Sequence, residues 1–126
     1  MSLVIDASAA YRLLLRDPLD SIIESNSELI APDLIVPELL NARWVSARRG
    51  ARTPEVDSIL TFLDQVRIVP SLPFASLAAR LSERLGHPIY DCLYVAVARQ
   101  ENIRLLTADL HLERKLRSHK LEAVLL

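Results

Sequence analysis

The stretch Leu3-Val4-Ile5-Asp6-Ala7-Ser8 shows how this chain is built. Its three apolar residues stop at an acid, and residues 7–15 continue with the apolar spacing of a helix. Either Asp6 or Ser8 can cap that helix, because both side chains accept hydrogen bonds from free backbone N–H groups. We therefore expect a strand that leads directly into a helix, with an acid at the junction.

The rest of the chain repeats this alternation of short apolar runs and helical segments. Gly50 and Gly86 each end a helical segment, and Pro37 either kinks a helix or marks its start at Glu38. Parallel strands need long connections, which are usually helical, so the alternation predicts helices that cover a mostly parallel sheet. We expect further strands at 28–31, 66–69, 104–107 and 122–126, and further helices at 19–25, 33–49, 55–65, 74–85, 88–100 and 108–117.

Size and composition limit the class of protein. The chain has 126 residues, of which 51% are hydrophobic, and a formal net charge of -1. These values are typical of a folded protein with one domain, which we place at residues 1–126. The longest strongly apolar stretch, Cys92 to Ala98, is much shorter than the roughly 20 residues of a membrane-spanning helix, and the N-terminus has no signal-peptide pattern. We expect a cytoplasmic protein that does not bind membranes.

Carboxylates are the main candidates for metal ligands, because a single cysteine excludes a cysteine-rich zinc site and leaves histidine as the lesser alternative. Asp6 and Asp109 each follow closely after a predicted strand. In open α/β sheets ligands bind beyond the carboxyl ends of the strands, so neighbouring parallel strands would bring both acids to one edge. Each acid alone could instead be an ordinary helix cap.

Asp91 begins the run Asp91-Cys92-Leu93-Tyr94-Val95-Ala96-Val97-Ala98, whose apolar character predicts a buried helix. An ionised carboxylate is costly to bury alone, so an acid at this position needs a cation, a metal or hydrogen bonds. The alternative is an acid in the capping turn whose side chain faces water. We expect Asp91 to be buried and to bind metal.

Glu38 follows Pro37 at the head of another predicted helix, where a carboxylate is favoured by the helix dipole in any case. Asn41 lies three residues further on and therefore on the same helical face. Its amide could hold Glu38 or a bound water by hydrogen bond, and Ser8 could do the same beside Asp6.

Arginines make up 13 of the 15 basic residues, and several lie in one stretch that contains no acid. They form either a patch that contacts phosphates or the solvated end of a helix, where cations are favoured by the dipole. The arginines of this stretch are Arg43, Arg48, Arg49 and Arg52.

Other polar and aromatic residues indicate structural roles. The chain has two glycines and therefore no glycine-rich phosphate loop, and no two histidines have the i, i+4 spacing of a helical metal site. We expect Cys92 in the core, His87, His111 and His119 at the surface or in caps, and Trp44 and Tyr90 in the core or an interface.

Four motifs in this order resemble the PIN-domain family, and most closely its VapC-type toxins. The resemblance covers essentially the whole chain and includes Arg48-Arg49-Gly50. The motifs stand as Val4-Ile5-Asp6-Ala7-Ser8, Pro37-Glu38-Leu39-Leu40-Asn41-Ala42, Ile89-Tyr90-Asp91-Cys92-Leu93-Tyr94-Val95-Ala96-Val97-Ala98 and Leu106-Thr107-Ala108-Asp109.

The resemblance implies a three-layer α/β/α sandwich in which four acids bind Mg²⁺ or Mn²⁺ and hydrolyse RNA. It also implies a homodimer that is silenced by a small antitoxin. In this interpretation Asp6, Asp91 and Asp109 bind the metal directly or through water, and Glu38 completes the site or orients the attacking water. Their hydrogen-bonding support would come from Ser8, Asn41 and Thr107, and the RNA backbone would contact Arg43, Arg48, Arg49 and Arg52.

Two alternatives compete with a metal-dependent ribonuclease. A phosphatase or a receiver domain also places aspartates at strand ends, but the phosphatase pattern needs a second Asp where this chain has Ser8. A receiver would also require paired early acids and a late lysine. The other alternative is a non-catalytic PIN-like module that binds RNA or a protein, and the presence of all four acids argues against it.

Overall fold

The computed structural model describes residues 1–16, 28–121 and 123–125. Strands and helices alternate through this part of the chain, as the apolar pattern predicts. The elements are β1 (Ser2–Ile5), α1 (Ala7–Leu15), β2 (Glu28–Pro32), α3 (Ile35–Arg48), α4 (Val56–Asp64), β3 (Val66–Val69), the short 3₁₀ helix η1 (Leu72–Phe74), α5 (Ala75–Leu85), α6 (Ile89–Glu101), β4 (Arg104–Thr107), α7 (Leu110–Ser118) and β5 (Ala123–Leu125).

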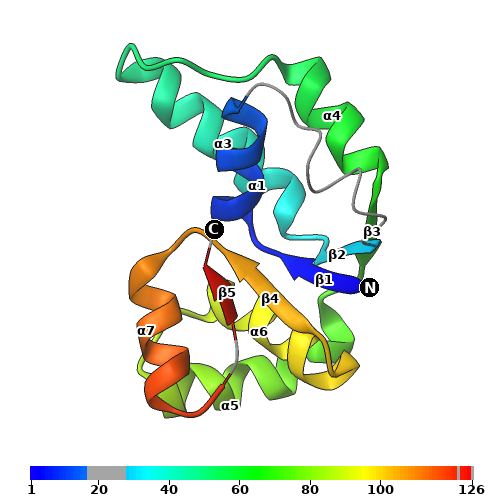
Figure 1. The fold of residues 1–126 in the computed structure, drawn as a ribbon, viewed down its shortest axis with the longest axis vertical. Coiled ribbons are helices and arrows are strands. Elements are labelled where there is room, and N and C mark those ends of the chain that lie inside the picture. Colours follow the sequence, from blue (N-terminus) through cyan, green and yellow to red (C-terminus); the bar gives the residue numbers. More distant parts are fainter. Residues whose placement is uncertain (17–27, 122, 126) are drawn as a thin grey trace.

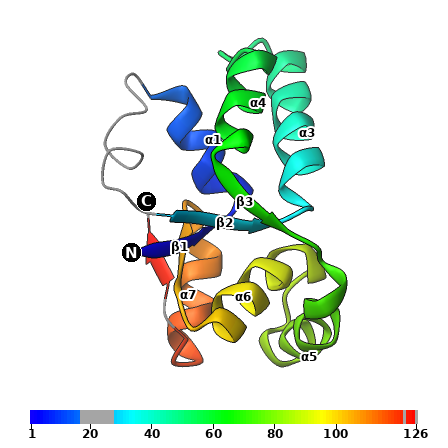
Figure 2. The ribbon, with the colours of Figure 1, turned by 90° about the vertical axis from the view of Figure 1, so that its right-hand side faces the viewer.

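The described strands form a parallel sheet in the order β3-β2-β1-β4-β5. Helices α1, α3 and α4 cover one face of this sheet, and α5, α6 and α7 cover the other (Figures 1 and 2). The chain thus forms the central strand β1 first and adds β2 and β3 on one side of it. It then crosses the other face of the sheet through α5 and α6 and forms β4 on the opposite side of β1. This arrangement confirms the predicted α/β/α sandwich with a parallel sheet.

The order of the strands reverses between β1 and β4, because β2 and β3 lie on one side of β1 whereas β4 and β5 lie on the other. Val4 pairs with Ile30 of β2 on one side and with Leu105 of β4 on the other. Just beyond β1, the backbone N–H of Asp6 donates to the carbonyl of Leu106 at 3.1 Å. Ligands of open α/β sheets bind at such a reversal, beyond the carboxyl ends of the strands. Asp6 and Asp109 both lie there.

Two helix starts differ from their predicted positions. Helix α3 begins at Ile35 and holds Pro37 in its first turn without a break, because the first N–H groups of a helix have no partner within it. Helix α4 begins at Val56 with Glu55 as its N-cap, one residue later than the predicted start. The helix predicted at 19–25 lies outside the described residues.

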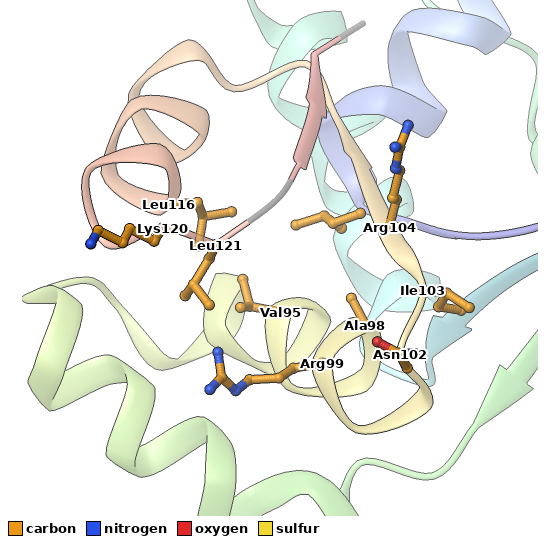
Figure 3. A pocket seen from close by; sticks show the side chains of 10 residues that line it. Val95, Ala98, Arg99, Asn102, Ile103, Arg104, Leu116, Lys120 and Leu121 are labelled. Carbon is orange, nitrogen blue, oxygen red and sulfur yellow. The ribbon is translucent and has the colours of Figure 1, made fainter.

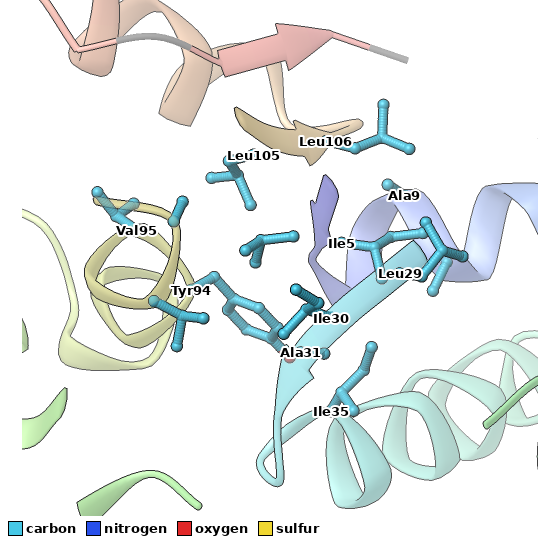
Figure 4. Close-up of a cluster of buried hydrophobic side chains, with 14 of the residues drawn as sticks. Ile5, Ala9, Leu29, Ile30, Ala31, Ile35, Tyr94, Val95, Leu105 and Leu106 are labelled. Carbon is cyan, nitrogen blue, oxygen red and sulfur yellow. The ribbon is translucent and has the colours of Figure 1, made fainter. Parts of the chain in front are cut away.

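The core fills both interfaces between the sheet and its helices. Ile5, Ile30 and Leu105 of the central strands are at most 2% exposed. Tyr94 of α6 lies against β2, with its ring close to Ile30 and Ala31 and its hydroxyl oxygen directed toward the α3 side (Figure 4). Tyr94 therefore reaches from the layer that contains α6 to the edge of the sheet where the acids lie. None of the helices in the described part of the chain has the length and hydrophobicity that crossing a membrane would require.

The Gly86→Ala protein should be less stable than the wild type by about 1–2 kcal/mol, the usual cost of a left-handed residue that carries a Cβ. Gly86 ends α5 with φ of 59°, and a Cβ added there meets no atom within 4 Å. The cost would thus come from the backbone alone. Urea unfolding measures it, with Arg80→Ala on the exposed face of α5 as a control that should change stability by less than about 0.5 kcal/mol. Equal effects of the two substitutions would contradict the explanation.

Candidate active site

Asp6 is the most buried acid of the candidate site, with 1% of its surface exposed. Its Oδ1 accepts hydrogen bonds from Ser8 Oγ at 2.7 Å and from the Ala9 backbone N–H at 2.9 Å, so it also caps α1. Burial raises the pKa of Asp6 above its ordinary value; hydrogen bonds from Ser8, Thr107 and Ala9 oppose the shift, and the charge of Asp91 adds to it. A cation bound beside this buried carboxylate would therefore favour its ionised form.

Ser8 and Thr107 connect the ends of β1 and β4. The Ser8 hydroxyl lies 3.3 Å from Thr107 Oγ1 and accepts the backbone N–H of Ala108 at 3.0 Å. Thr107 Oγ1 accepts the backbone N–H of Asp109 at 3.1 Å. Asp109 therefore joins Asp6 through a chain of hydrogen bonds. The Asp109 carboxylate itself caps α7 by accepting from Leu112 N at 3.1 Å.

Glu38 reaches the site from the opposite layer of the sandwich to Tyr94. The Tyr94 hydroxyl donates to Glu38 Oε1 at 2.5 Å. Burial raises the pKa of Glu38, the hydrogen bond from Tyr94 opposes that shift, and the charges of Asp91 and Asp6 reinforce it. The pKa of Tyr94 is itself raised far above its usual range by burial and by Glu38, so its hydroxyl remains a donor.

Asp91 lies in the first turn of α6, and its position corrects one expectation. The side chain is 32% exposed rather than buried, because only the following residues of α6 turn into the core. His87 Nε2 lies 2.6 Å from Asp91 Oδ2, and the His87 ring is buried. The expected surface or capping role of His87 is therefore wrong. The hydrogen bond that we required for Asp91 is present.

The structure thus brings Asp6, Glu38 and Asp91 within electrostatic range of one another, while Asp109 borders them through Ser8 and Thr107. Within the described ranges, no three acids, histidines or cysteines are gathered closely enough to form a finished metal cage. The donor set nevertheless fits a hard cation: Mg²⁺ takes oxygen ligands, keeps several of its waters and needs only one or two direct carboxylates. Asp6, Glu38 and Asp91 supply oxygen donors of this kind.

A groove of about 620 Å³ runs beside the acids between α1 and α3. The residues that line it include Ser8, Glu38, Asn41, Val45 and Ser46. Asn41 is exposed to this groove, and no hydrogen bond joins it to Glu38 in the described part of the chain. The predicted supporting role of Asn41 remains a prediction, whereas Ser8 contacts Asp6 directly.

The predicted arginine patch extends from Arg43, in the middle of α3, to Arg52, beyond the end of that helix. Arg43 donates through Nε to the carbonyl of Pro54 at 2.9 Å, so it holds the loop before α4. The Arg48 guanidinium lies 4.8 Å from the centre of the Trp44 ring. Arg49 and Arg52 are exposed. This stretch is solvated, and its binding of phosphates remains a prediction.

Several other expectations can be compared with the structure. Cys92 is fully buried, and burial raises the pKa of its thiol to about 11, which confirms it as a core residue. Trp44 and Tyr90 are 55% and 58% exposed, so neither belongs to the core of this chain. His111 is exposed and His119 contacts the C-terminal turn of α7, as expected.

The sequence analysis did not place His87 or Tyr94 in the candidate site, although both contact candidate acids. A signal was present for Tyr94, since a tyrosine in an otherwise apolar run needs a partner for its hydroxyl. His87 precedes Asp91 by four residues but lies outside the helix, so helical spacing could not predict their contact.

A separate cavity of about 550 Å³ lies at the other end of β4 (Figure 3). Val95 and Leu116 line its apolar part, while Arg99 and Lys120 border it. It adjoins the first residues of β4, whereas Thr107 ends that strand. The cavity is therefore not part of the acidic site.

The Tyr94→Phe protein should lose about 1–2 kcal/mol of stability at neutral pH, because Glu38 would lose its donor while remaining partly buried. Urea unfolding measures this loss. Tyr11→Phe is the matched control, since the buried Tyr11 hydroxyl has no hydrogen-bond partner among the described residues. Removing that hydroxyl should leave stability unchanged or raise it. Equal losses in both proteins would show that the Tyr94 hydrogen bond is not the cause.

Comparisons with known proteins agree with this arrangement. Ribonuclease VapC3 of Pyrobaculum aerophilum is 31% identical over 124 residues, which cover 91% of this chain and 95% of the relative. The crystal structure of PAE2754 from the same organism superposes with a TM-score of 0.74 at 26% identity, covering 91% of this chain and 84% of the solved one. A chain of a toxin-antitoxin complex from Klebsiella pneumoniae shares the fold, with a TM-score of 0.60 at 10% identity and coverage of 90% and 89%.

The family comparison covers most of the chain. The PIN domain matches residues 3–116, a range that includes all four candidate acids. Together with the identity to a ribonuclease over nearly its whole length, this match shows that the chain belongs to the PIN domain family.

Proposed function

We propose that this protein is a metal-dependent endoribonuclease that hydrolyses RNA phosphodiester bonds at the end of β1. The observation that supports it best is the buried carboxylate of Asp6 beside Asp91 and Glu38. Burial, reinforced by the neighbouring charges, raises the pKa of Asp6 and Glu38, so their ionised forms are costly to the fold unless a cation compensates them. An oxygen-seeking divalent cation, Mg²⁺ or Mn²⁺, fits that need.

Asp6, Asp91 and Asp109 would hold the cation directly or through water. When bound, it would lower the pKa of a water molecule and offset charge that develops on the phosphate. Glu38 would orient the attacking water through Oε2, since Oε1 accepts from Tyr94. Ser8 and Thr107 would keep the β1 and β4 ends in register, so that Asp6 and Asp109 face one substrate.

The exposed arginines would bind the RNA backbone away from the scissile bond. Arg48 lies ten residues after Glu38 on α3, which is about 15 Å along a helix. Along α3 the groove is lined from Glu38 as far as Ser46, two residues before Arg48. A single RNA strand could therefore contact Arg48, Arg49 and Arg52 while one of its phosphates lies at the acids, and Arg43 would support the loop that carries Arg52.

The biological role that fits best is the toxin of a toxin-antitoxin pair. Its relative in Pyrobaculum aerophilum carries a VapC name, and a chain of the same fold was solved within a toxin-antitoxin complex. We accordingly expect a small antitoxin protein as partner, a homodimer, and a single nuclease domain at residues 1–126.

Purified protein incubated with a pool of structured RNAs tests the activity. Cleavage should require Mg²⁺ or Mn²⁺ and stop when EDTA is added. RNA binding that is indifferent to EDTA, without cleavage of any RNA, would instead identify a non-catalytic binding module. Hydrolysis of a small phosphomonoester with an aspartyl-phosphate intermediate would identify a phosphatase.

A further inference from the structure

His87 differs from the other two histidines in being buried. Its side chain is 6% exposed, and Nε2 lies 2.6 Å from Oδ2 of Asp91. His111 is exposed on α7, and its ring centre lies 5.9 Å from that of His87 without a hydrogen bond between them. The contact with Asp91 is thus the polar contact that the His87 ring makes within the described part of the chain.

The backbone around His87 is fixed from two helices. Ser82 Oγ of α5 donates to the His87 carbonyl at 2.5 Å, and the His87 N–H donates to the Ser82 carbonyl at 3.1 Å. Lys115 Nζ of α7 donates to the carbonyl of Gly86 at 2.7 Å. These contacts set the position of the ring independently of Asp91. The ring can therefore orient the carboxylate rather than follow it.

The chemistry of the contact determines which atom holds the hydrogen. A carboxylate that binds metal is ionised and only accepts hydrogen bonds, so in that state Nε2 of His87 carries the hydrogen and donates it to Asp91. The other ring nitrogen, Nδ1, is buried and has no hydrogen-bond partner among the described residues. A buried imidazole with one unsatisfied nitrogen is unusual, and its remaining hydrogen bond is directed at a candidate metal ligand.

We infer that His87 is a positioning residue that holds Asp91 in the orientation needed to bind the divalent cation. This inference rests on the proposed function, because it assigns Asp91 to a metal. The His87 hydrogen bond occupies Oδ2 and leaves Oδ1 for the cation or one of its waters. It also restrains a carboxylate that Asp6 and Glu38 repel. Donors that orient metal ligands typically change metal affinity by about 10- to 100-fold when removed.

Titration calorimetry of the RNA-free protein with Mn²⁺ tests the inference without relying on activity. His87→Leu removes the donor, and we expect affinity for Mn²⁺ to fall by about 10- to 100-fold. His87→Gln places an amide N–H at about the same reach as Nε2, and it should restore most of that affinity. His119→Gln, at the far end of α7, is the matched control and should bind as the wild type does.

A purely structural role for His87 makes different predictions. It would lower the urea midpoint of the metal-free protein and leave Mn²⁺ affinity of the folded fraction unchanged. We expect the reverse for His87→Leu: an unchanged midpoint and weakened binding. If His87→Leu does not fold, His87→Asn serves instead, because its shorter amide cannot reach the position of Nε2.

Three results would overturn the inference. If His87→Leu binds Mn²⁺ with wild-type affinity, His87 does not position Asp91, although the proposed metal site itself would stand. Equal weakening in His87→Gln and His87→Leu would show that ring shape, rather than the hydrogen bond, matters. Failure of the wild-type protein to bind Mn²⁺ would instead refute the proposed function together with this inference.

Discussion

The Asp6→Asn and Asp91→Asn proteins are expected to cleave RNA about 10²- to 10⁴-fold more slowly than the wild type in Mg²⁺. A bound divalent cation contributes several kcal/mol of charge stabilisation to a transition state, and each 1.36 kcal/mol corresponds to a factor of ten in rate. Asparagine keeps the size of aspartate but lacks the negative charge that attracts the cation. Single-turnover cleavage of one RNA from the sensitive pool measures the change.

Asp57→Asn is the matched control for both substitutions. Asp57 is an exposed acid in the first turn of α4, away from the candidate site, so the same chemical change there should leave cleavage at the wild-type rate. Circular dichroism should show that all three proteins are folded. Wild-type cleavage by both Asp6→Asn and Asp91→Asn would falsify the carboxylate site.

The same Asp6→Asn substitution should make the metal-free protein more stable by about 1–3 kcal/mol, the range typical of the desolvation penalty of a buried polar group. Asn can still accept from Ser8 and Ala9 through Oδ1, and it is as good a helix cap as Asp. Its amide group replaces Oδ2 and no longer repels Asp91. Urea unfolding in EDTA measures the gain, again with Asp57→Asn as the control.

The pH dependence of that stability has a defined sign. Because folding raises the pKa of Asp6 above 3.8, the native state binds more protons than the unfolded state between that value and the raised one. The stability of the metal-free wild type should therefore fall as pH rises through this window. Asp6→Asn should flatten the slope in part, since Glu38, whose pKa is also raised, remains. A stability that rises with pH in this window would contradict the assigned shifts.

Metal should reverse the order of the two proteins. A ligand present at 1,000 times its dissociation constant stabilises the native state by about 4.1 kcal/mol, which exceeds the gain of about 1–3 kcal/mol expected from Asp6→Asn. Wild-type protein should gain this stability with Mn²⁺, whereas Asp6→Asn should gain much less. We therefore expect that binding of the cation returns the stability that the acid cluster costs the metal-free protein.

Most of the fold could be predicted from the sequence because local signals and tertiary packing agree. The apolar run before Asp6 and the glycine after α5 mark element boundaries that the structure confirms. The predictions are less accurate at the starts of α3 and α4, where local rules allow more than one first residue and packing selects one. The face of the sheet that each helix covers follows from strand order, which no local signal specifies.

The candidate acids could be selected from the sequence, but their environments could not. Because Asp6 and Asp109 follow strands in the sequence, they were predicted to lie at one edge of the sheet, and the structure places both where the strand order reverses. The apolar run after Asp91 suggested burial, yet the first turn of α6 leaves that acid partly exposed and Asp6 is the buried one. Contacts such as His87 with Asp91 and Tyr94 with Glu38 depend on how layers pack, so spacing alone does not reveal them.

Anomalous X-ray diffraction from crystals grown with Mn²⁺ shows directly whether the acids at the ends of β1 and β4 bind a divalent cation. We expect an anomalous peak within bonding distance of carboxylate oxygens of Asp6 and Asp91, with Asp109 bound directly or through water. Mn²⁺ located elsewhere on the protein, with no peak at Asp6 and Asp91, would contradict this expectation.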